Sequence, residues 1–115
     1  DIKPANFVIG HNNPEKIYMV DFGLSTKYNT KKGKHVAFKN NVGFVGTVRY
    51  VSTNIHMKIR PSRRDDLESL AYILIFFFKG SLPWQGIYRQ YKVKGIKMNQ
   101  EKQNTLIGDK KMCTD

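Results

Sequence analysis

Cysteine is almost absent from this 115-residue sequence, in which Cys113 stands alone. One cysteine cannot form an internal disulfide, and no C-x-x-C or Cys/His cluster indicates a zinc site, so we expect a reducing, intracellular compartment. Long apolar runs are also absent. The longest has nine residues, Leu70 to Phe78, whereas a membrane-spanning helix needs roughly 20. The run therefore predicts a core segment, and we expect no membrane association.

Acidic residues are scarce, with 9 Asp and Glu against 20 Lys and Arg and a formal net charge of +11. The basic residues form small groups along the chain, within residues 31–34, 60–64 and 89–102. This scatter does not favour a dedicated nucleic-acid role, and an acidic or phosphorylated protein partner explains the same surplus. The length allows at most one domain. No targeting leader is visible and both ends look cut, so we expect a fragment of a longer chain.

Two short segments at the start of the chain predict a β-hairpin. Residues 6–10 and 16–20 are rich in β-branched and aromatic side chains, and residues 11–15 between them are typical of a turn. If Gly10 faces Ile17, Asn6 faces Asp21 at the open end of the hairpin. This register would bring two polar side chains together.

A long irregular stretch and one helix are predicted next. Residues 23–54 are loop-like, and a loop of that length in a compact chain is usually functional or disordered. Ser62 is a typical N-cap, acidic residues follow in the first turn, and Gly80 ends the pattern. Apolar residues recur at 67, 70, 71, 74, 75 and 78, and the opposite face is apolar too, so we expect this helix, Leu74 included, to be buried on nearly all sides. Residues 87–115 are predicted to be the least ordered.

Five residues near the start carry the chemistry. Asp1, Lys3 and Asn6 form a D-x-K-x-x-N pattern, and Asp21 opens a D-F-G triplet that ends at Gly23. Together they resemble the catalytic loop and magnesium loop of eukaryotic protein kinases. In phosphoryl transfer a carboxylate orients the incoming hydroxyl, which suits Asp1, and a cation neutralises the transferred phosphate, which suits Lys3. The resemblance implies ATP and Mg²⁺ as cofactors, with Asn6 and Asp21 as metal and cofactor ligands.

Three further motifs narrow the resemblance to the casein kinase 1 family of serine/threonine kinases. They are residues 46–50 (GTVRY), 62–69 (SRRDDLES) and 80–86 (GSLPWQG). Residues 52–54 (STN) stand where most kinases have A-P-E and are similar to the S-I-N of casein kinase 1. Residues 43–46 also resemble tau-tubulin kinases, but the R-R-D-D run at 63–66 favours casein kinase 1. The resemblance is dense over residues 1–86 and faint afterwards.

The family resemblance implies roles for five more residues. Thr47 would lie near the catalytic Asp and Lys and set their geometry, although it could be a plain loop threonine. Arg49, the Gly86 amide and Lys102 would form a substrate anion site, where a guanidinium suits a phosphate; the alternative for Arg49 is a surface arginine. Lys102 is only the nearest candidate lysine. Asp66 would be a buried carboxylate that accepts hydrogen bonds from the catalytic-loop backbone, or else an exposed first-turn aspartate.

The resulting fold class is α+β, a partial kinase-like large (C-terminal) lobe, mainly α-helical with a hairpin that carries the catalytic and magnesium loops. We divide it into residues 1–23 (catalytic loop, hairpin and magnesium loop), 24–54 (activation segment), 62–79 (central helix) and 80–115, divergent after residue 86.

The resemblance implies a monomeric kinase, cytoplasmic and also nuclear, that transfers the ATP γ-phosphate to Ser or Thr of acidic or pre-phosphorylated proteins. The sequence has no G-x-G-x-x-G and no V-A-I-K to cradle a nucleotide, so we expect these residues alone to be inactive. The alternative is a truncated kinase-like binding module or a non-functional gene fragment.

Overall fold

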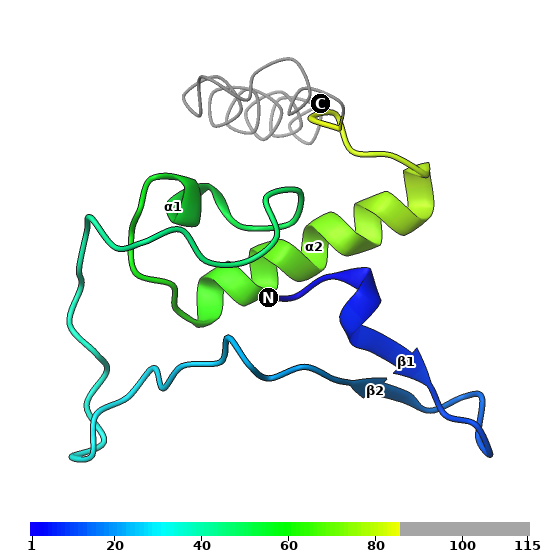
Figure 1. Ribbon diagram of the computed structural model, residues 1–115, viewed down its shortest axis with the longest axis horizontal. Helices are drawn as coiled ribbons and strands as arrows, with labels where there is room; N and C mark the ends of the chain where they lie inside the picture. Colours follow the sequence, from blue (N-terminus) through cyan, green and yellow to red (C-terminus); the bar gives the residue numbers. More distant parts are fainter. Residues whose placement is uncertain (86–115) are drawn as a thin grey trace, which may run out of the picture.

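The structure is a computed structural model that describes residues 1–85. In chain order it has the 3-10 helix η1 (Pro4–Asn6), strands β1 (Phe7–Ile9) and β2 (Ile17–Met19), and helices α1 (Thr53–His56) and α2 (Arg63–Lys79). Helix α2 runs through the middle of the described part, with the hairpin on one side and α1 on the other (Figure 1). Two strands and one main helix agree with the α+β expectation. The prediction for residues 87–115 lies outside the described residues.

The hairpin forms as predicted, but in a different register. Strands β1 and β2 are antiparallel and pair Phe7 with Met19 and Ile9 with Ile17. The Gly10 N–H donates to the Lys16 carbonyl at 2.8 Å, so the turn is five residues long as expected. The predicted pairing of Gly10 with Ile17 is therefore wrong by one residue. A slip of one residue in a strand reverses the side to which every side chain points.

Helix α2 begins and ends at the predicted residues. The Ser62 N–H donates to Asp65 Oδ2 at 2.7 Å, which satisfies one of the free backbone donors at the start of the helix. Gly80 follows the last turn with φ of 74°, a left-handed conformation that glycine adopts without steric cost. Its N–H donates to the Phe76 carbonyl at 2.8 Å, so both ends of α2 are capped.

The prediction that α2 is buried on nearly all sides is wrong. Its buried residues are Asp65, Ser69, Tyr72 and Ile73, which share one face at helical spacing. The opposite face carries the apolar residues whose spacing predicts burial, and it is exposed. Leu74 is 59% accessible and Phe78 is 90% accessible. The apolar residues surround the helix, so the pattern could not indicate which face the core covers.

A small aromatic core holds three parts of the chain together. Tyr72 and Ile73 of α2 pack with Tyr50 and with Leu82 and Trp84 beyond the helix. The rings of Tyr72 and Trp84 meet edge to face with centroids 4.8 Å apart, a favourable aromatic geometry. Ile2 and Phe7 pack against this cluster, which fixes the start of the chain beside α2.

Residues 23–54 are mostly irregular, as predicted, with a single bridge between Asn29 and His35. Helix α1 was not predicted, and it begins inside this stretch. Ser52 caps it by accepting a hydrogen bond from the Ile55 N–H at 3.3 Å. Over residues 1–85 no helix combines the length and apolar character that crossing a membrane requires.

Candidate active site

Asp1 is held by residues from two distant parts of the sequence. Lys3 Nζ lies 2.7 Å from Asp1 Oδ2. The Thr47 N–H and Oγ1 both donate to Asp1 Oδ1, at 3.0 and 2.8 Å, across 46 positions in the sequence. The Asp1 side chain is only 10% accessible. The structure therefore brings Asp1, Lys3 and Thr47 into one cluster.

The hydrogen bonds leave Asp1 with a defined free position. An ionised carboxylate has about four acceptor positions, two on each oxygen. Thr47 fills both positions on Oδ1, and Lys3 fills one on Oδ2. One acceptor position on Oδ2 remains for a further donor, such as a hydroxyl group.

Gly46 permits the approach of Thr47 to Asp1. Its φ is 103°, which side chains rarely adopt, and a Cβ at this position would lie 2.7 Å from Val51 Cγ1 and 3.6 Å from Asp1 Oδ1. A larger residue would therefore be strained by its backbone conformation and would clash with the Val51 side chain, next to the segment that carries Thr47. The backbone conformation and the close approach of Val51 explain why the G-T-V-R-Y motif begins with glycine.

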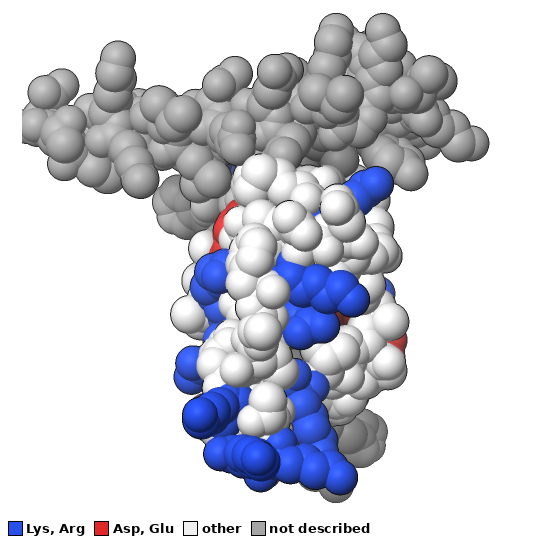
Figure 2. All heavy atoms as spheres, turned by 90° about the vertical axis from the view of Figure 1, so that its left-hand side faces the viewer, with Lys and Arg blue, Asp and Glu red and all other residues white. Residues whose placement is uncertain are grey.

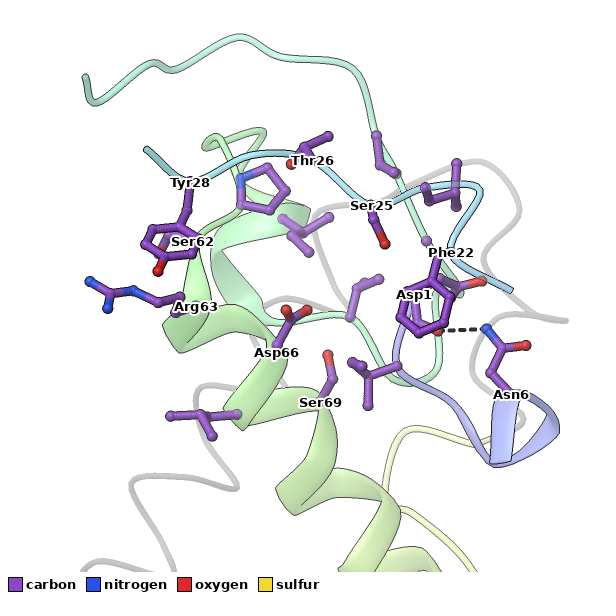
Figure 3. Close-up of a pocket in the computed structure, with 18 of the residues that line it drawn as sticks. Asp1, Asn6, Phe22, Ser25, Thr26, Tyr28, Ser62, Arg63, Asp66 and Ser69 are labelled. Carbon is purple, nitrogen blue, oxygen red and sulfur yellow. Dashed lines mark hydrogen bonds between the residues drawn. The ribbon is translucent and has the colours of Figure 1, made fainter. Parts of the chain in front are cut away.

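Asp1, Asn6 and Asp21 line one cavity of about 890 Å³ between the hairpin, residues 24–54 and α2. Figure 3 shows Asp1 and Asn6 in this cavity. The Asn6 Nδ2 donates to the Asp1 carbonyl at 2.9 Å, which leaves the amide oxygen as the free acceptor. The prediction that Asn6 faces Asp21 is wrong. The observed register instead pairs Asn6 with Val20, whose N–H donates to the Asn6 carbonyl at 2.9 Å.

Asp21 has a backbone conformation that turns the chain away from the hairpin. Its φ is 62°, a left-handed conformation that Asp tolerates better than most residues. Its Oδ1 accepts a hydrogen bond from the Gly23 N–H at 3.2 Å, which stabilises the turn. Asp21 is exposed at the cavity.

The cavity supplies oxygen ligands but no complete metal cage. Among residues 1–85 no group of three His, Cys, Asp or Glu side chains could hold a metal ion. Mg²⁺ commonly binds to one or two protein ligands together with substrate phosphates, so a dedicated cage is not needed. The amide oxygen of Asn6 and the carboxylate of Asp21, on the wall of one cavity, fit an ion held jointly with phosphates.

The buried carboxylate at the start of α2 is Asp65, and the prediction that it is Asp66 is wrong. Asp65 is 1% accessible, whereas Asp66 is exposed and lines the cavity. Asp65 Oδ1 accepts hydrogen bonds from Ser52 Oγ at 2.6 Å and Asn54 Nδ2 at 3.1 Å. Its partners are thus Ser52, Asn54 and the N-cap residue Ser62.

The environment of Asp65 lowers the pKa of its carboxyl group. Burial alone would raise the pKa, but hydrogen bonds from Ser52, the Ser62 backbone and Asn54, with the charge of Arg64, outweigh it. The charged form is therefore stabilised although the side chain is buried. The S-T-N motif at residues 52–54 supplies two of these hydrogen bonds. The sequence indicates this motif but does not identify Asp65 as the residue that it binds.

Glu68 forms a second connection between α1 and α2. Its Oε1 accepts hydrogen bonds from the Thr53 N–H at 2.8 Å and from the Tyr72 hydroxyl at 2.6 Å. Burial, and then the hydrogen bond and charge of Glu68, raise the pKa of Tyr72, which keeps this phenol protonated. Asp65 and Glu68 together fix residues 52–54 on α2.

Of the predicted anion site, only Arg49 lies within the described residues; Gly86 and Lys102 do not. Arg49 is exposed, and its guanidinium carbon lies 5.9 Å from the centre of the Tyr50 ring. Its carbonyl accepts a hydrogen bond from Trp84 Nε1 at 2.8 Å, so the backbone of Arg49 is fixed on the core.

Comparison with known proteins identifies the family of this chain. Residues 1–114 match the protein kinase domain, and the chain therefore belongs to the protein kinase family. Within that family, the chain is 44% identical over 114 residues to "Casein kinase I homolog 2" of Schizosaccharomyces pombe (strain 972 / ATCC 24843). The match covers 95% of this chain and 26% of the relative, so the chain spans about a quarter of the relative's length. The identification as a casein kinase 1 family member is confirmed.

Proposed function

We propose that these residues form the catalytic part of a serine/threonine protein kinase of the casein kinase 1 type. The observation that carries the proposal is the position of Asp1, whose carboxylate is fixed by Lys3 and Thr47 and keeps one acceptor position open at the cavity. A carboxylate fixed in this way is suited to orient one hydroxyl group.

In the proposed reaction the substrate hydroxyl attacks the γ-phosphorus of ATP. A new O–P bond forms, the bond from the γ-phosphorus to the bridging oxygen breaks, and ADP leaves. Asp1 Oδ2 accepts the proton of the hydroxyl group, and Lys3, 2.7 Å from the same oxygen, carries positive charge beside the transferred group. Thr47 keeps Asp1 Oδ1 occupied, so the carboxylate presents Oδ2.

Asn6 and Asp21 would hold Mg²⁺ in this proposal, and the ion would neutralise charge on the ATP phosphates. Asn6 is 6% accessible, and its amide is oriented by the Asp1 carbonyl, so one hydrogen bond couples the metal ligand to the catalytic residue. The strand lysine and Gly-rich loop that bind ATP in kinases are not among these 115 residues. Activity therefore has to be measured with a nucleotide-binding lobe present.

The test is a chimera in which these 115 residues replace the matching region of the fission yeast relative. Asp1→Asn should lower kcat by at least about 100-fold with little change in the KM for ATP, because general-base catalysis is lost while the metal ligands remain. Glu15→Gln, the same chemical change at an exposed residue of the hairpin turn, is the matched control and should keep normal activity.

Two results would contradict the assignment. One is a chimera that folds but shows no Asp1-dependent phosphorylation of a casein-type acidic protein, which would favour a kinase-like binding module or a non-functional segment. The other is an Asp1→Asn variant with near-normal turnover. Circular dichroism of each variant separates loss of chemistry from loss of folding.

The substrate class we propose is a Ser or Thr that follows an acidic or phosphorylated residue, recognised by Arg49 with Gly86 and Lys102. Support comes from the exposed guanidinium of Arg49 and from the bond that fixes its backbone to Trp84, two residues before Gly86 in the sequence. In the chimera, Arg49→Ala should weaken use of a pre-phosphorylated peptide about tenfold or more, and that of the unphosphorylated peptide less. Equal losses would contradict this role.

A further inference from the structure

The segment from Phe22 to Arg64 carries charge of one sign. Between Phe22 and Arg64 the sequence has ten Lys and Arg residues and no Asp or Glu. On the face that contains residues 28–40, Lys and Arg side chains gather over the lower part and few acidic ones are visible (Figure 2). A surface of this kind attracts anions, because its positive potentials add.

Backbone contacts hold two separate parts of this basic stretch against each other. The Arg60 N–H donates to the Lys39 carbonyl at 2.8 Å, and Arg60 Nη1 donates to the Ala37 carbonyl at 3.2 Å. Nearby, the guanidinium of Arg63 lies 4.6 Å from the centre of the Tyr28 ring. Residues 28–39 are thus held against residues 60–63. The hydrogen bond to Ala37 also restricts the conformation of the Arg60 side chain.

A pocket of about 230 Å³ lies where these two parts meet. His35, Arg60 and Arg64 contribute its ionisable side chains, and no acidic residue lines it. It is separate from the cavity that contains Asp1, although residues 60–62 contribute to the walls of both. We call it the Arg60–Arg64 pocket.

Both guanidinium groups of the pocket keep donors free for a ligand. Arg60 uses Nη1 for the Ala37 carbonyl, which leaves its other N–H groups. Arg64 Nε lies 3.7 Å from Asp65 Oδ2, which leaves the two terminal nitrogens of the guanidinium to donate to a ligand. The Arg64 side chain is 55% accessible. Asp65 already accepts hydrogen bonds from Ser52, Asn54 and Ser62, so it does not fully neutralise Arg64.

We propose that the Arg60–Arg64 pocket binds the phosphate of a phosphorylated Ser or Thr in a polypeptide segment, at a position distinct from the Arg49 site. A phosphate monoester carries about −1.5 to −2 charges and three acceptor oxygens, which match two guanidinium forks. A side-chain carboxylate carries one charge and two oxygens and would satisfy fewer donors. The proposal concerns binding only and does not depend on kinase activity.

Nucleic acid fits the same pocket less well. Its phosphodiesters carry one charge each, and strong binding needs many contacts along a strand. The three ionisable residues line one small volume of about 230 Å³, which favours a single dianionic group over a strand of phosphodiesters. The neighbouring lysine-rich turn at residues 31–34 would add general attraction for an acidic flank of the same segment.

The experiment titrates the 115-residue chain into a fluorescein-labelled peptide, Gly-Ala-pSer-Ala-Gly, at low salt and follows anisotropy. The unphosphorylated peptide, the peptide with Glu in place of pSer, and a 12-nucleotide oligo-dT are run in parallel. We expect the phosphopeptide to bind at least tenfold more tightly than the Ser and Glu peptides and more tightly than the oligonucleotide. Arg60→Gln and Arg64→Gln should each weaken phosphopeptide binding at least tenfold.

Lys58→Gln is the matched control, because it also removes one positive charge, at an exposed residue that lies two positions before Arg60 and does not line the pocket, and it should change affinity less than threefold. Arg60→Lys keeps the charge but lacks the fork and should also weaken binding. Circular dichroism at 222 nm verifies that each variant retains α2. If Arg60→Gln unfolds, Arg64→Gln still tests the pocket, because the Arg64 side chain is more exposed. Equal effects of Lys58→Gln and Arg64→Gln, unchanged binding in both pocket variants, or tighter binding of oligo-dT would overturn the proposal.

Discussion

Two adjacent carboxylates have opposite environments at the start of α2. Asp65 is buried and accepts hydrogen bonds from Ser52, Asn54 and the Ser62 backbone, whereas Asp66 is exposed at the large cavity. Residues 65 and 66 are identical in type, and both suit a first helical turn. Their difference comes entirely from which side of α2 meets residues 52–54.

Asp65→Asn should therefore destabilise the fold by about 2 to 3 kcal/mol, because it removes a charge-assisted acceptor from a buried network. Asp66→Asn should cost less than about 1 kcal/mol, the size of an exposed helix-dipole contribution. Urea unfolding of the two variants, followed at 222 nm, measures the difference. Equal losses, or a larger loss for Asp66→Asn, would contradict the assigned burial.

The same network predicts how stability depends on pH. Folding lowers the pKa of Asp65, so its contribution is fully present above the unfolded-state value of about 3.9 and is lost as the pH falls through the lower folded-state value. Between pH 7 and pH 2 the wild-type chain should lose more stability than Asp65→Asn, and the loss should begin below about pH 4. Parallel pH profiles for the two proteins would show that Asp65 does not contribute in this way.

At the scale of elements, the sequence specifies where α2 begins and ends but not how it is oriented. Ser62 and Gly80 are local signals, because capping involves only neighbouring backbone groups. The buried face depends on contacts with Tyr50 and Trp84, which lie outside the helix, 22 and 12 positions from Tyr72 in sequence. The hairpin register was mispredicted for a related reason: β1 and β2 are mostly exposed, so no buried face fixes the pairing.

Two neighbouring residues of α2 test its orientation. Ile73 is 2% accessible in the core and Leu74 is 59% accessible. Ile73→Ala should reduce the free energy of unfolding by about 2 to 5 kcal/mol, through lost burial and a residual cavity. Leu74→Ala removes a side chain of equal size from the exposed face and should cost less than about 1 kcal/mol. Denaturant titration measures both, and a cost for Leu74→Ala as large as that for Ile73→Ala would reverse the orientation assigned to α2.

At the scale of the whole molecule, the site combines local motifs with long-range contacts. The D-x-K-x-x-N pattern lies within six residues, so the sequence alone indicated Asp1, Lys3 and Asn6. Thr47 lies 46 positions from Asp1 and was identified only through the family resemblance. The Arg60–Arg64 pocket could not be predicted at all, because it exists only where residues 35–38 fold against residues 60–64. Local chemistry is visible in sequence, whereas juxtaposition depends on the tertiary fold.

Trp84, the single tryptophan, reports on whether these distant parts unfold together. It is 4% accessible, packs on Tyr72 of α2 and donates to the Arg49 carbonyl, so its environment depends on the helix and on the segment that carries Arg49. In urea, the red shift of its emission and the loss of ellipticity at 222 nm should have the same midpoint, as expected for one cooperative unit. Tyr72→Ala should lower both midpoints equally. A Trp84 transition at lower urea than the loss of helix would mean that the segment after α2 detaches first, and that the core around Tyr50, Tyr72 and Trp84 does not unite the described chain.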